Sequence, residues 1–204
     1  LLDAEPGLSA GEAPAGADVA ASSTTHLSVV DAEGNAVALT SSIETSFGSR
    51  VMVRGFLLNN QLTDFAFRPV RDGRPVANRA EPGKRPLSAM APTIVLDRAR
   101  RLVMVVGSPG GPRIIPYVAQ TIVGVLDWKL DIQRAIELPH VVNLDGATEL
   151  EAGTAAAALL PELARRGHLV ELRRHESGLH AIVLAEERLE GGADPRRGGV
   201  ALGE

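Results

Sequence analysis

Residues 24–43 read TTHLSVVDAEGNAVALTSSI, which is two runs of β character on either side of a turn. The runs cover 25–31 and 36–43, and Ala32-Glu33-Gly34-Asn35 between them is a turn of the kind that joins antiparallel strands. The stretch therefore predicts a β-hairpin, and folded structure is expected to begin at Thr24 or just after it.

The segment before the hairpin has a different composition. Residues 1–23 (LLDAEPGLSAGEAPAGADVAASS) are rich in Ala, Gly, Ser, Pro and acidic residues and show no sustained apolar period. This composition predicts a linker or flexible tail, and it lacks the basic and apolar regions of a signal peptide. No apolar run in the sequence approaches the roughly 20 residues that a membrane span needs. We therefore expect two parts, a tail over 1–23 and a folded domain over 24–204.

The remainder of the sequence mixes strand and helix patterns. A second hairpin is predicted over 91–107, and apolar residues at helical spacing predict a helix after Pro112, with Pro116 in its first turn. Hairpins first, helices next and strands last favour an α+β layered domain over a doubly wound one. The other expected elements are helices over 131–138 (capped by Asp131) and 155–166, strands over 168–173 and 179–184, loops over 45–54 and 66–86, and a Gly/Arg-rich tail from Gly191.

Composition excludes several classes of protein. The chain has 204 residues, is 45% hydrophobic and 23% charged, and can bury a sizeable core. Its net charge of −4 argues against a nucleic-acid partner, which usually meets a basic surface. The absence of cysteine excludes disulfides, thiol catalysis and cysteine metal sites.

The histidines offer no recognisable catalytic or metal motif. No G-x-S-x-G elbow is present, and no two histidines have zinc-helix spacing. We therefore interpret each of the five, at positions 26, 140, 168, 175 and 180, as an ordinary surface or strand residue.

Four consecutive hydroxyl residues, Ser22-Ser23-Thr24-Thr25, stand at the border between tail and hairpin. They are either the polar end of a linker or a self-cleavage site. In the second case a hydroxyl attacks the preceding carbonyl, an N→O shift gives an ester, and hydrolysis exposes a new N-terminal residue. The new α-amine, with an ordinary pKa of roughly 7.7–8.0, can then serve as the base for its own hydroxyl.

Several long motifs now point to one family. The stretch 24–31 resembles the start of the small subunit of γ-glutamyltranspeptidases, which are N-terminal-nucleophile hydrolases made as one precursor and cut in two. The resemblance covers roughly residues 24–200. It continues through Phe47-Gly48, LLNNQLTDF (57–65), GKRPLSAMAPTI (83–94), GSPGG (107–111) and ADPRR (193–197). It implies a four-layer αββα sandwich that is incomplete without the large subunit, with 1–23 as the end of that subunit and 24–204 as the small catalytic subunit.

The resemblance also implies catalytic roles. It makes Thr24 the nucleophile, although the residues alone do not choose it over its neighbours Ser22, Ser23 and Thr25. Ser42 stands where the family usually has a second Thr bonded to the nucleophile. Gly110 and Gly111 match glycines whose amides form an oxyanion hole, and a plain tight turn is the alternative interpretation.

Substrate contacts follow in the same way. Gln61 and Asp64 match residues that hold the α-amino group of a γ-glutamyl substrate, although Asp64 could also be a solvated loop carboxylate. Ser88 matches one of two adjacent serines that bind the α-carboxylate. Two departures concern this pocket: Ala89 replaces the second serine, and Glu44 replaces an Asn of many members, which makes the pocket more acidic.

We therefore expect a γ-glutamyl hydrolase or transferase that acts on glutathione-like amides, with a large subunit of the same precursor as its partner. The large subunit would supply an arginine for the substrate α-carboxylate. No metal or cofactor is implied, and the family resemblance suggests a periplasmic or secreted location. Two alternatives stay open: an acylase of the same superfamily with another acyl group (glutaryl, cephalosporin or poly-γ-glutamate), and an inactive, uncleaved fragment.

Overall fold

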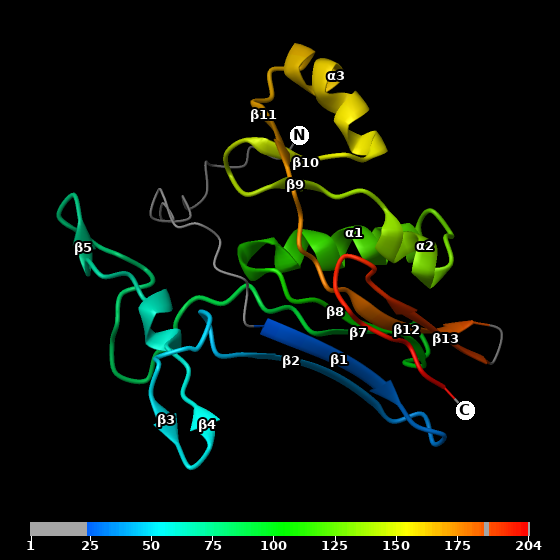
Figure 1. Cartoon of the computed structure of the whole chain (residues 1–204), viewed down its shortest axis with the longest axis horizontal. Helices are drawn as coiled ribbons and strands as arrows, with labels where there is room; N and C mark the ends of the chain where they lie inside the picture. Colours follow the sequence, from blue (N-terminus) through cyan, green and yellow to red (C-terminus); the bar gives the residue numbers. More distant parts are fainter. Residues whose placement is uncertain (1–23, 186–187, 204) are drawn as a thin grey trace.

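A computed structural model describes residues 24–185 and 188–203, so the expected tail over 1–23 lies outside the described residues. The architecture is α+β, as the sequence predicts (Figure 1). The strands are β1 (Thr24–Val30), β2 (Ala36–Ser42), β3 (Met52–Val53), β4 (Phe56–Leu57), β5 (Val70–Arg71), β6 (Arg74–Pro75), β7 (Thr93–Leu96), β8 (Leu102–Gly107), β9 (Val141–Asn143), β10 (Thr148–Glu151), β11 (Val170–Arg173), β12 (His180–Ala185) and β13 (Arg188–Ala193). The helices are α1 (Ile114–Leu126), α2 (Ile132–Glu137) and α3 (Leu160–Arg165), with 3₁₀ turns η1 (Gln61–Asp64), η2 (Gly111–Arg113) and η3 (Ala155–Leu159).

The first hairpin forms as predicted. Strands β1 and β2 pair in antiparallel register from Thr24 opposite Ser42 to Val30 opposite Ala36. The turn is closed by the Asp31 carboxylate, which accepts hydrogen bonds from the backbone and side-chain amides of Asn35 at 2.7 and 2.8 Å. The chemistry of the turn is local, and it sets the register that places Thr24 beside Ser42.

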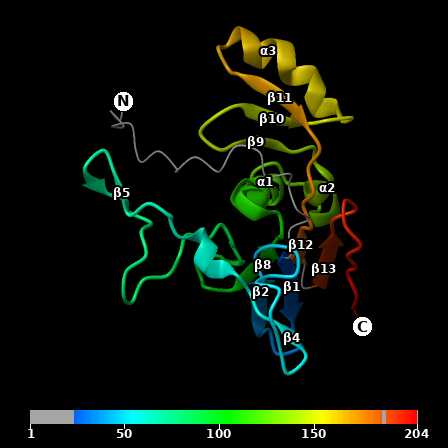
Figure 2. The ribbon, with the colours of Figure 1, turned by 60° about the vertical axis from the view of Figure 1, so that its left-hand side comes forward.

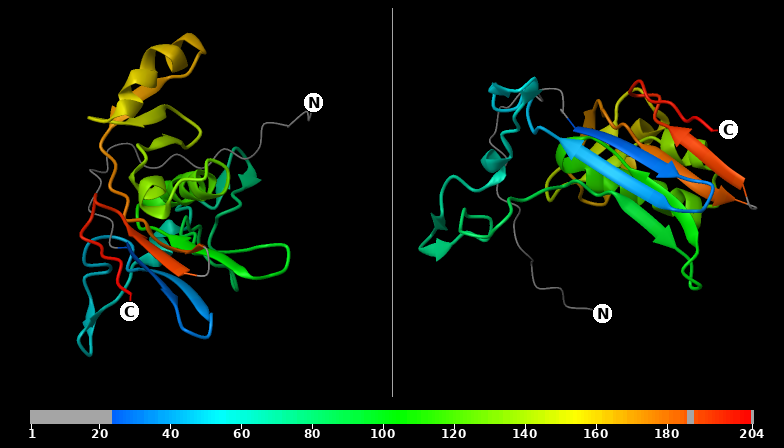
Figure 3. Two further views of the ribbon diagram at one scale, coloured as in Figure 1. Left: turned by 90° about the vertical axis from the view of Figure 1, so that its right-hand side faces the viewer. Right: turned by 90° about the horizontal axis from the view of Figure 1, so that it is seen from below.

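The hairpin packs on a four-stranded antiparallel sheet of order β13-β12-β8-β7 (Figure 3). Helices α1 and α2 cover the other face of that sheet, where Met104 and Val106 of β8 join the apolar core. The opposite side of β8 meets the hairpin, because a Cβ added to Gly107 would lie 2.2 Å from the His26 ring. The first hairpin, the four-stranded sheet, and α1 with α2 thus form three stacked layers, and the β9–β10–β11 sheet and α3 lie beyond the helices.

The outer face of the hairpin is apolar and uncovered. Leu27 pairs with Leu39 and Val29 with Val37, and these four side chains are 44–50% exposed. No helix of the described residues covers them. The inner face is the more polar one, because Thr24, His26, Ser28 and Thr40 alternate with these apolar residues. This reversed pattern leaves room for the fourth, helical layer of an αββα sandwich.

Strands β9, β10 and β13 lie in parts of the chain where the sequence predicts no strand. Strands β9 and β10 form a sheet with β11, and β13 begins before the tail that was expected from Gly191. The sequence of β10, Thr-Glu-Leu-Glu, looks half solvated, yet all four residues are buried. Burial is possible because the Glu149 carboxylate pairs with Arg113 and the Glu151 carboxylate with Arg196.

Both regions predicted as loops contain short strands. Strand β3 lies within 45–54 and pairs with β4, and β5 and β6 form a small hairpin within 66–86. The segment that carries β5 extends away from the stacked layers (Figure 2). The side-chain amide of Asn78 anchors this segment, because it donates to the backbone carbonyl of Asp64 at 2.6 Å.

Helix α1 begins where the sequence predicts, just after Pro112. Its buried residues are Ile114, Tyr117, Val118, Thr121 and Gly124, and Ile122 and Val125 also pack against the core. Ile115 is 54% exposed. The helix has 13 residues, and no helix in the described ranges has the length and apolarity to cross a membrane.

Two histidines predicted to be ordinary are buried away from regular strands. His140 and His175 are 1% and 3% exposed, whereas His168 lies on the surface. Burial, followed by the charge of Arg196, lowers the pKa of His140 to about 4, and burial together with His180 does the same for His26. Both rings are therefore neutral at pH 7.

Acidification should consequently destabilise the fold. Below pH 6.5 His26 and His140 take up protons in the unfolded chain, whereas in the folded chain they stay neutral down to about pH 4. The free energy of unfolding therefore falls across this window by up to about 1.4 kcal/mol per pH unit for each ring. His140→Gln keeps a side-chain N–H donor and removes one titration. The variant should lose less melting temperature between pH 7 and pH 4.5 than the wild type, and His168→Gln is the matched control. Equal pH dependence in wild type and His140→Gln would contradict the assignment.

Candidate active site

The hydroxyls of Thr24 and Ser42 meet at the open end of the first hairpin. Thr24 Oγ1 donates to Ser42 Oγ at 3.0 Å, as their cross-strand pairing requires. Ser42 Oγ also accepts the backbone N–H of Glu44 at 2.9 Å. The Ser42 oxygen therefore links Thr24, the first residue of β1, to Glu44, two residues after the end of β2.

Glu44 is held in an uncommon backbone conformation. Its φ of 76° lies in the left-handed region, which costs a non-glycine residue about 1–2 kcal/mol. This conformation brings its N–H back to Ser42, and its carboxylate approaches the turn η1. Backbone strain of this kind is concentrated at functional sites.

Two carboxylates and an amide form a cluster beside the hydroxyl pair. The Gln61 amide donates to Asp64 Oδ2 at 2.5 Å and to Glu44 Oε2 at 3.4 Å. Partial burial of Glu44, followed by the nearby negative charge of Asp64, raises the pKa of the Glu44 carboxyl. A cation placed between the two carboxylates would relieve their repulsion, so the cluster is suited to an ammonium group.

Asn60 positions this cluster, and sequence reasoning did not assign it a role. Its side-chain oxygen accepts hydrogen bonds from the N–H and the hydroxyl of Thr45 at 3.2 and 3.0 Å. Its own N–H donates to the carbonyl of Ile43 at 3.3 Å. The turn η1 is thereby fastened to the segment after β2. The run Asn59-Asn60-Gln61 was visible in the sequence, but only the fold shows which amide faces inward.

Ser88 lies apart from this cluster. Its side chain is exposed, and its hydroxyl accepts the N–H of Met90 at 3.2 Å. Within the described residues it makes no hydrogen bond to Glu44, Gln61 or Asp64. The structure therefore brings together five of the predicted residues, Thr24, Ser42, Glu44, Gln61 and Asp64, and leaves Ser88 outside their hydrogen-bonded group.

Gly110 and Gly111 form the turn between β8 and α1. Their φ angles are 143° and 59°, and both lie in the region that favours glycine. Neither amide donates to another group among the described residues. Because His26 lies on Gly107, the start of β1 and the end of β8 share one end of the stacked sheets (Figure 1). The turn therefore leaves β8 at the end of the stack where Thr24 begins β1.

A small hollow of about 90 Å³ opens beside Gly110. Its wall includes Arg113, Arg173 and Arg174 but also Glu176, and Glu149 pairs with Arg113 and Arg173, so the positive charge around the turn is partly neutralised. Free amides and guanidinium groups together favour a developing negative charge. Among the described residues, no group of three His, Cys, Asp or Glu side chains is arranged to hold a metal ion.

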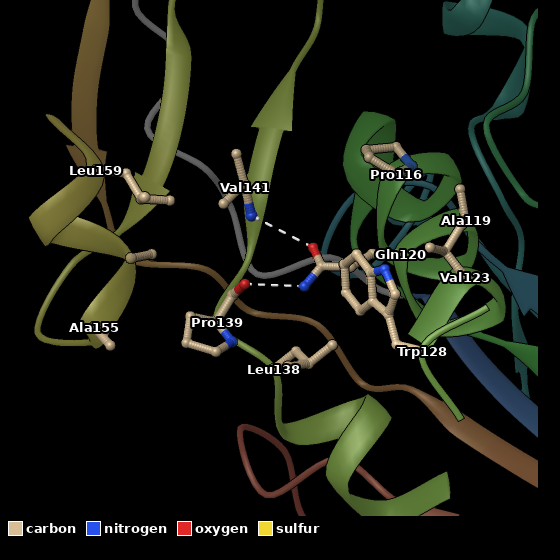
Figure 4. Close-up of a pocket in the computed structure, with 11 residues that line it drawn as sticks. Pro116, Ala119, Gln120, Val123, Trp128, Leu138, Pro139, Val141, Ala155 and Leu159 are labelled. Atoms are coloured by element: carbon tan, nitrogen blue, oxygen red, sulfur yellow. Dashed lines mark hydrogen bonds between the residues drawn. The ribbon is translucent and has the colours of Figure 1, made fainter. Parts of the chain in front are cut away.

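A larger groove, of about 640 Å³, lies on the side of α1 that faces away from the four-stranded sheet (Figure 4). Its only amide side chain, Gln120, bridges the carbonyl of Pro139 and the N–H of Val141 at 2.9 and 3.4 Å. The other lining side chains are apolar. The groove therefore offers no nucleophile or base, and the reactive groups belong to the Thr24 end of the sheets.

Comparisons with known proteins place the chain among relatives of one family. The sequence profile of the family described as Gamma-glutamyltranspeptidase matches residues 5–204. Glutathione hydrolase proenzyme of Escherichia coli is 38% identical over 186 residues, which is 85% of this chain and 31% of that protein. Acylase ACY 1 proenzyme of a Pseudomonas strain is 35% identical over 86% of this chain and 29% of its own length. This chain thus spans about a third of the curated relatives that it matches.

A solved structure extends the likeness to three dimensions. The γ-glutamyltranspeptidase of Helicobacter pylori superposes with a TM-score of 0.75 at 36% identity. The match covers 85% of this chain and 100% of that chain. The family profile spans nearly the whole sequence, and the fold agrees with a solved member. The chain therefore belongs to the γ-glutamyltranspeptidase family.

Proposed function

We propose that this chain is the catalytic part of a γ-glutamyl hydrolase or transferase in which Thr24 is the nucleophile. The observation that carries the proposal is the double role of Ser42, whose oxygen accepts both the Thr24 hydroxyl and the Glu44 amide. A reactive hydroxyl and an ammonium-binding cluster are thereby joined through three consecutive residues. A γ-glutamyl substrate needs both features, because its α-amino group and its reactive γ-carbonyl lie a few bonds apart.

Thr24 first has to become N-terminal. Its hydroxyl attacks the carbonyl carbon of Ser23, the peptide nitrogen is displaced as the Thr24 α-amine, and water hydrolyses the resulting ester. The freed amine then accepts the proton of the Thr24 hydroxyl during attack on the substrate. Residues 1–23 would end the large subunit, and residues 24–204 would form the small one.

Acyl transfer then follows in two steps. Thr24 Oγ1 adds to the γ-carbonyl, and the negative oxygen of the tetrahedral intermediate is stabilised by the amides of Gly110 and Gly111. The leaving amine takes the proton from the α-amine, and a γ-glutamyl ester remains on Thr24. Water or the amine of an acceptor amino acid then attacks the ester and restores the free hydroxyl.

Recognition of the acyl group falls to the cluster after β2. Glu44 and Asp64 supply negative charge for the substrate ammonium, with Gln61 donating between them. Ser88 would bind the α-carboxylate, and Ala89 beside it has no hydroxyl to add a second hydrogen bond. The greater share of carboxylate recognition would therefore come from the rest of the precursor.

The outer face of the first hairpin supports a partner in the same precursor. The relatives are proenzymes about three times as long as this chain. The uncovered apolar side chains of β1 and β2, Leu27, Val29, Val37 and Leu39, are the surface that an added helical layer would bury. We therefore propose that the large subunit packs there and completes the αββα sandwich.

The acylase relative favours a second candidate function. Acylase ACY 1 proenzyme is nearly as similar to this chain as the glutathione hydrolases are. The same nucleophile could therefore serve another acyl group, such as a glutaryl group, which lacks the α-amine. We prefer the γ-glutamyl group because the Glu44–Gln61–Asp64 cluster is acidic. An uncleaved, inactive fragment is the third possibility and is distinguished by the first experiment below.

Replacing the nucleophile should stop both maturation and catalysis. In the full-length protein that contains this chain, Thr24→Ala should remain one polypeptide by intact mass and should reduce hydrolysis of a γ-glutamyl anilide to background. The wild type should show a break between Ser23 and Thr24, with both pieces purifying together. Thr25→Ala, whose side chain lies on the other face of β1, should behave as wild type. Activity or cleavage that survives in Thr24→Ala would refute the assignment.

The acyl group can be identified by direct competition between substrates. The wild-type enzyme should hydrolyse a γ-glutamyl anilide with a kcat/KM at least tenfold above that for the glutaryl anilide, because only the first carries an ammonium group for Glu44 and Asp64. Steady-state kinetics on the two anilides provides the measurement. Faster turnover of the glutaryl compound would favour the acylase function instead.

Protonation of Glu44 should control how KM changes at acidic pH. Its raised pKa means that it takes up a proton at a higher pH than an ordinary carboxyl, so KM for a γ-glutamyl anilide should rise as the pH falls through that pKa. Glu44→Gln should raise KM about fivefold to tenfold at pH 8, about 1–1.4 kcal/mol, and flatten its rise at low pH. Glu33→Gln, in the exposed hairpin turn, is the control. An unchanged KM profile in Glu44→Gln would show that this carboxylate does not meet the ammonium.

A further inference from the structure

The turn at Gly110 lies directly on an aromatic ring. Tyr117 is the only tyrosine of the chain, and its side chain is 1% exposed at the start of α1. A Cβ added to Gly110 would lie 2.7 Å from Cε2 and 3.1 Å from Cδ2 of that ring. The ring therefore packs against the core-facing side of the Gly110 backbone and prevents the turn from moving closer to the core.

The position of the ring is itself fixed from two sides. The Tyr117 hydroxyl lies 2.8 Å from His175 Nδ1, and the ring stacks on His140 with 4.1 Å between centroids. Burial lowers the pKa of His175, which favours a neutral ring that accepts the phenolic hydrogen. The other nitrogen of His175 then carries the hydrogen and faces Glu149 Oε2 at 3.9 Å.

His140 is in turn oriented by a buried chain of hydrogen bonds. Ser177 Oγ donates to Asp194 Oδ2 at 2.5 Å and is 2.7 Å from His140 Nε2. Because the carboxylate can only accept, the Ser177 oxygen accepts from His140 Nε2–H, which defines the tautomer. The ring that stacks on Tyr117 therefore has one orientation.

A second attachment holds the other side of the turn. Arg113, two residues after Gly111, forms a two-point ion pair with Glu149 at 2.5 Å for both contacts. Its backbone N–H also donates to the carbonyl of Gly110 at 3.3 Å. Glu149 thus faces both Arg113 and His175. One carboxylate therefore links the glycine turn to the histidine that contacts the Tyr117 hydroxyl.

We propose that Tyr117, held by His175, is a positioning residue that aims the Gly110 and Gly111 amides at the reacting carbonyl oxygen. The inference rests on the proposed function, because it concerns the oxyanion site of that reaction. Tyr117 does not touch the substrate. It acts through Gly110, whose φ of 143° only a glycine readily adopts and whose Cα hydrogen side is closed by the ring.

The expected signature is kinetic. An oxyanion hole acts on the transition state, so a displaced turn should lower kcat and leave KM nearly unchanged. Loss of a whole oxyanion donor costs roughly 10²–10³ in kcat, so a shifted donor should cost roughly 10–100-fold. Autocleavage at Thr24 passes through the same kind of intermediate and should slow as well.

The test compares three variants of the full-length protein on a γ-glutamyl anilide. Tyr117→Leu removes the ring, Tyr117→Phe keeps the ring and removes the bond to His175, and Ile136→Ala truncates an equally buried residue of α2. Tyr117→Leu should lose 10–100-fold in kcat with KM within twofold of wild type. Tyr117→Phe should lie closer to wild type, and Ile136→Ala should lower the melting temperature with kcat unchanged.

Contrary outcomes are separable. An unchanged kcat in Tyr117→Leu, a loss that appears in KM, or an equal loss in Ile136→Ala overturns the positioning role. If Tyr117→Leu does not fold, Tyr117→Phe decides the question: a threefold or greater fall in kcat with KM unchanged supports the positioning role, and a kcat within threefold of wild type overturns it. A wild-type enzyme that hydrolyses no γ-glutamyl substrate overturns the proposed function, and this inference with it.

Discussion

The contact between the His26 ring and the backbone of Gly107 governs how the two sheets meet. Gly107 has no Cβ, and any larger residue would overlap the imidazole. The ring fits there only because its polar atoms are satisfied, with Thr40 and Ser28 hydroxyls at 2.8 and 3.1 Å. Ser28 in turn donates to the carbonyl of His180 in β12 at 3.3 Å. The first hairpin is therefore joined to β12 by a hydrogen bond and to β8 by the packing of the His26 ring on Gly107.

This contact has a direct consequence for the site. Thr24 precedes His26 by two residues and shares its face of β1, since side chains alternate along a strand. The glycine turn follows Gly107 by three residues. One interaction in the interior therefore brings a hydroxyl and two free amides to the same end of the stacked sheets. A change in the packing at this point would separate them, even with every site residue intact.

Buried charges hold the rest of this end in place. Glu149 pairs with Arg113, and Arg196 contacts both Glu151 and Asp194, all with little exposure. Such pairs add little net stability, because removing the charges from water is costly. They do restrict geometry: each guanidinium has only one arrangement that satisfies its partners. The segments 108–113 and 194–197 are therefore confined beside the β9–β10–β11 sheet and the end of α2.

The outer face of the first hairpin has the apolar character of a surface that another layer of protein buries. A two-stranded layer with polar residues inward and apolar residues outward is unfavourable in water alone. The pattern is reasonable when a further layer covers the outer face. The same reversal leaves hydroxyls and an imidazole between the sheets, where a reaction site can be built on rigid strands.

The sequence by itself determined the features that depend on neighbours along the chain. The Asp31–Asn35 turn, the Asp131 cap of α2 and the glycines at 110 and 111 are settled by backbone angles and short-range hydrogen bonds, and the ordered motifs pointed to the family. Only the tertiary structure decided what depends on distant partners. Strand β10 reads as polar until Arg113 and Arg196 neutralise its two glutamates, and His140 and His175 are indistinguishable from surface residues until Tyr117 and Ser177 surround them. The reason is physical: turns and caps are fixed by a few adjacent dihedral angles, whereas the burial of a charge or an imidazole depends on groups that only the folded chain brings within reach.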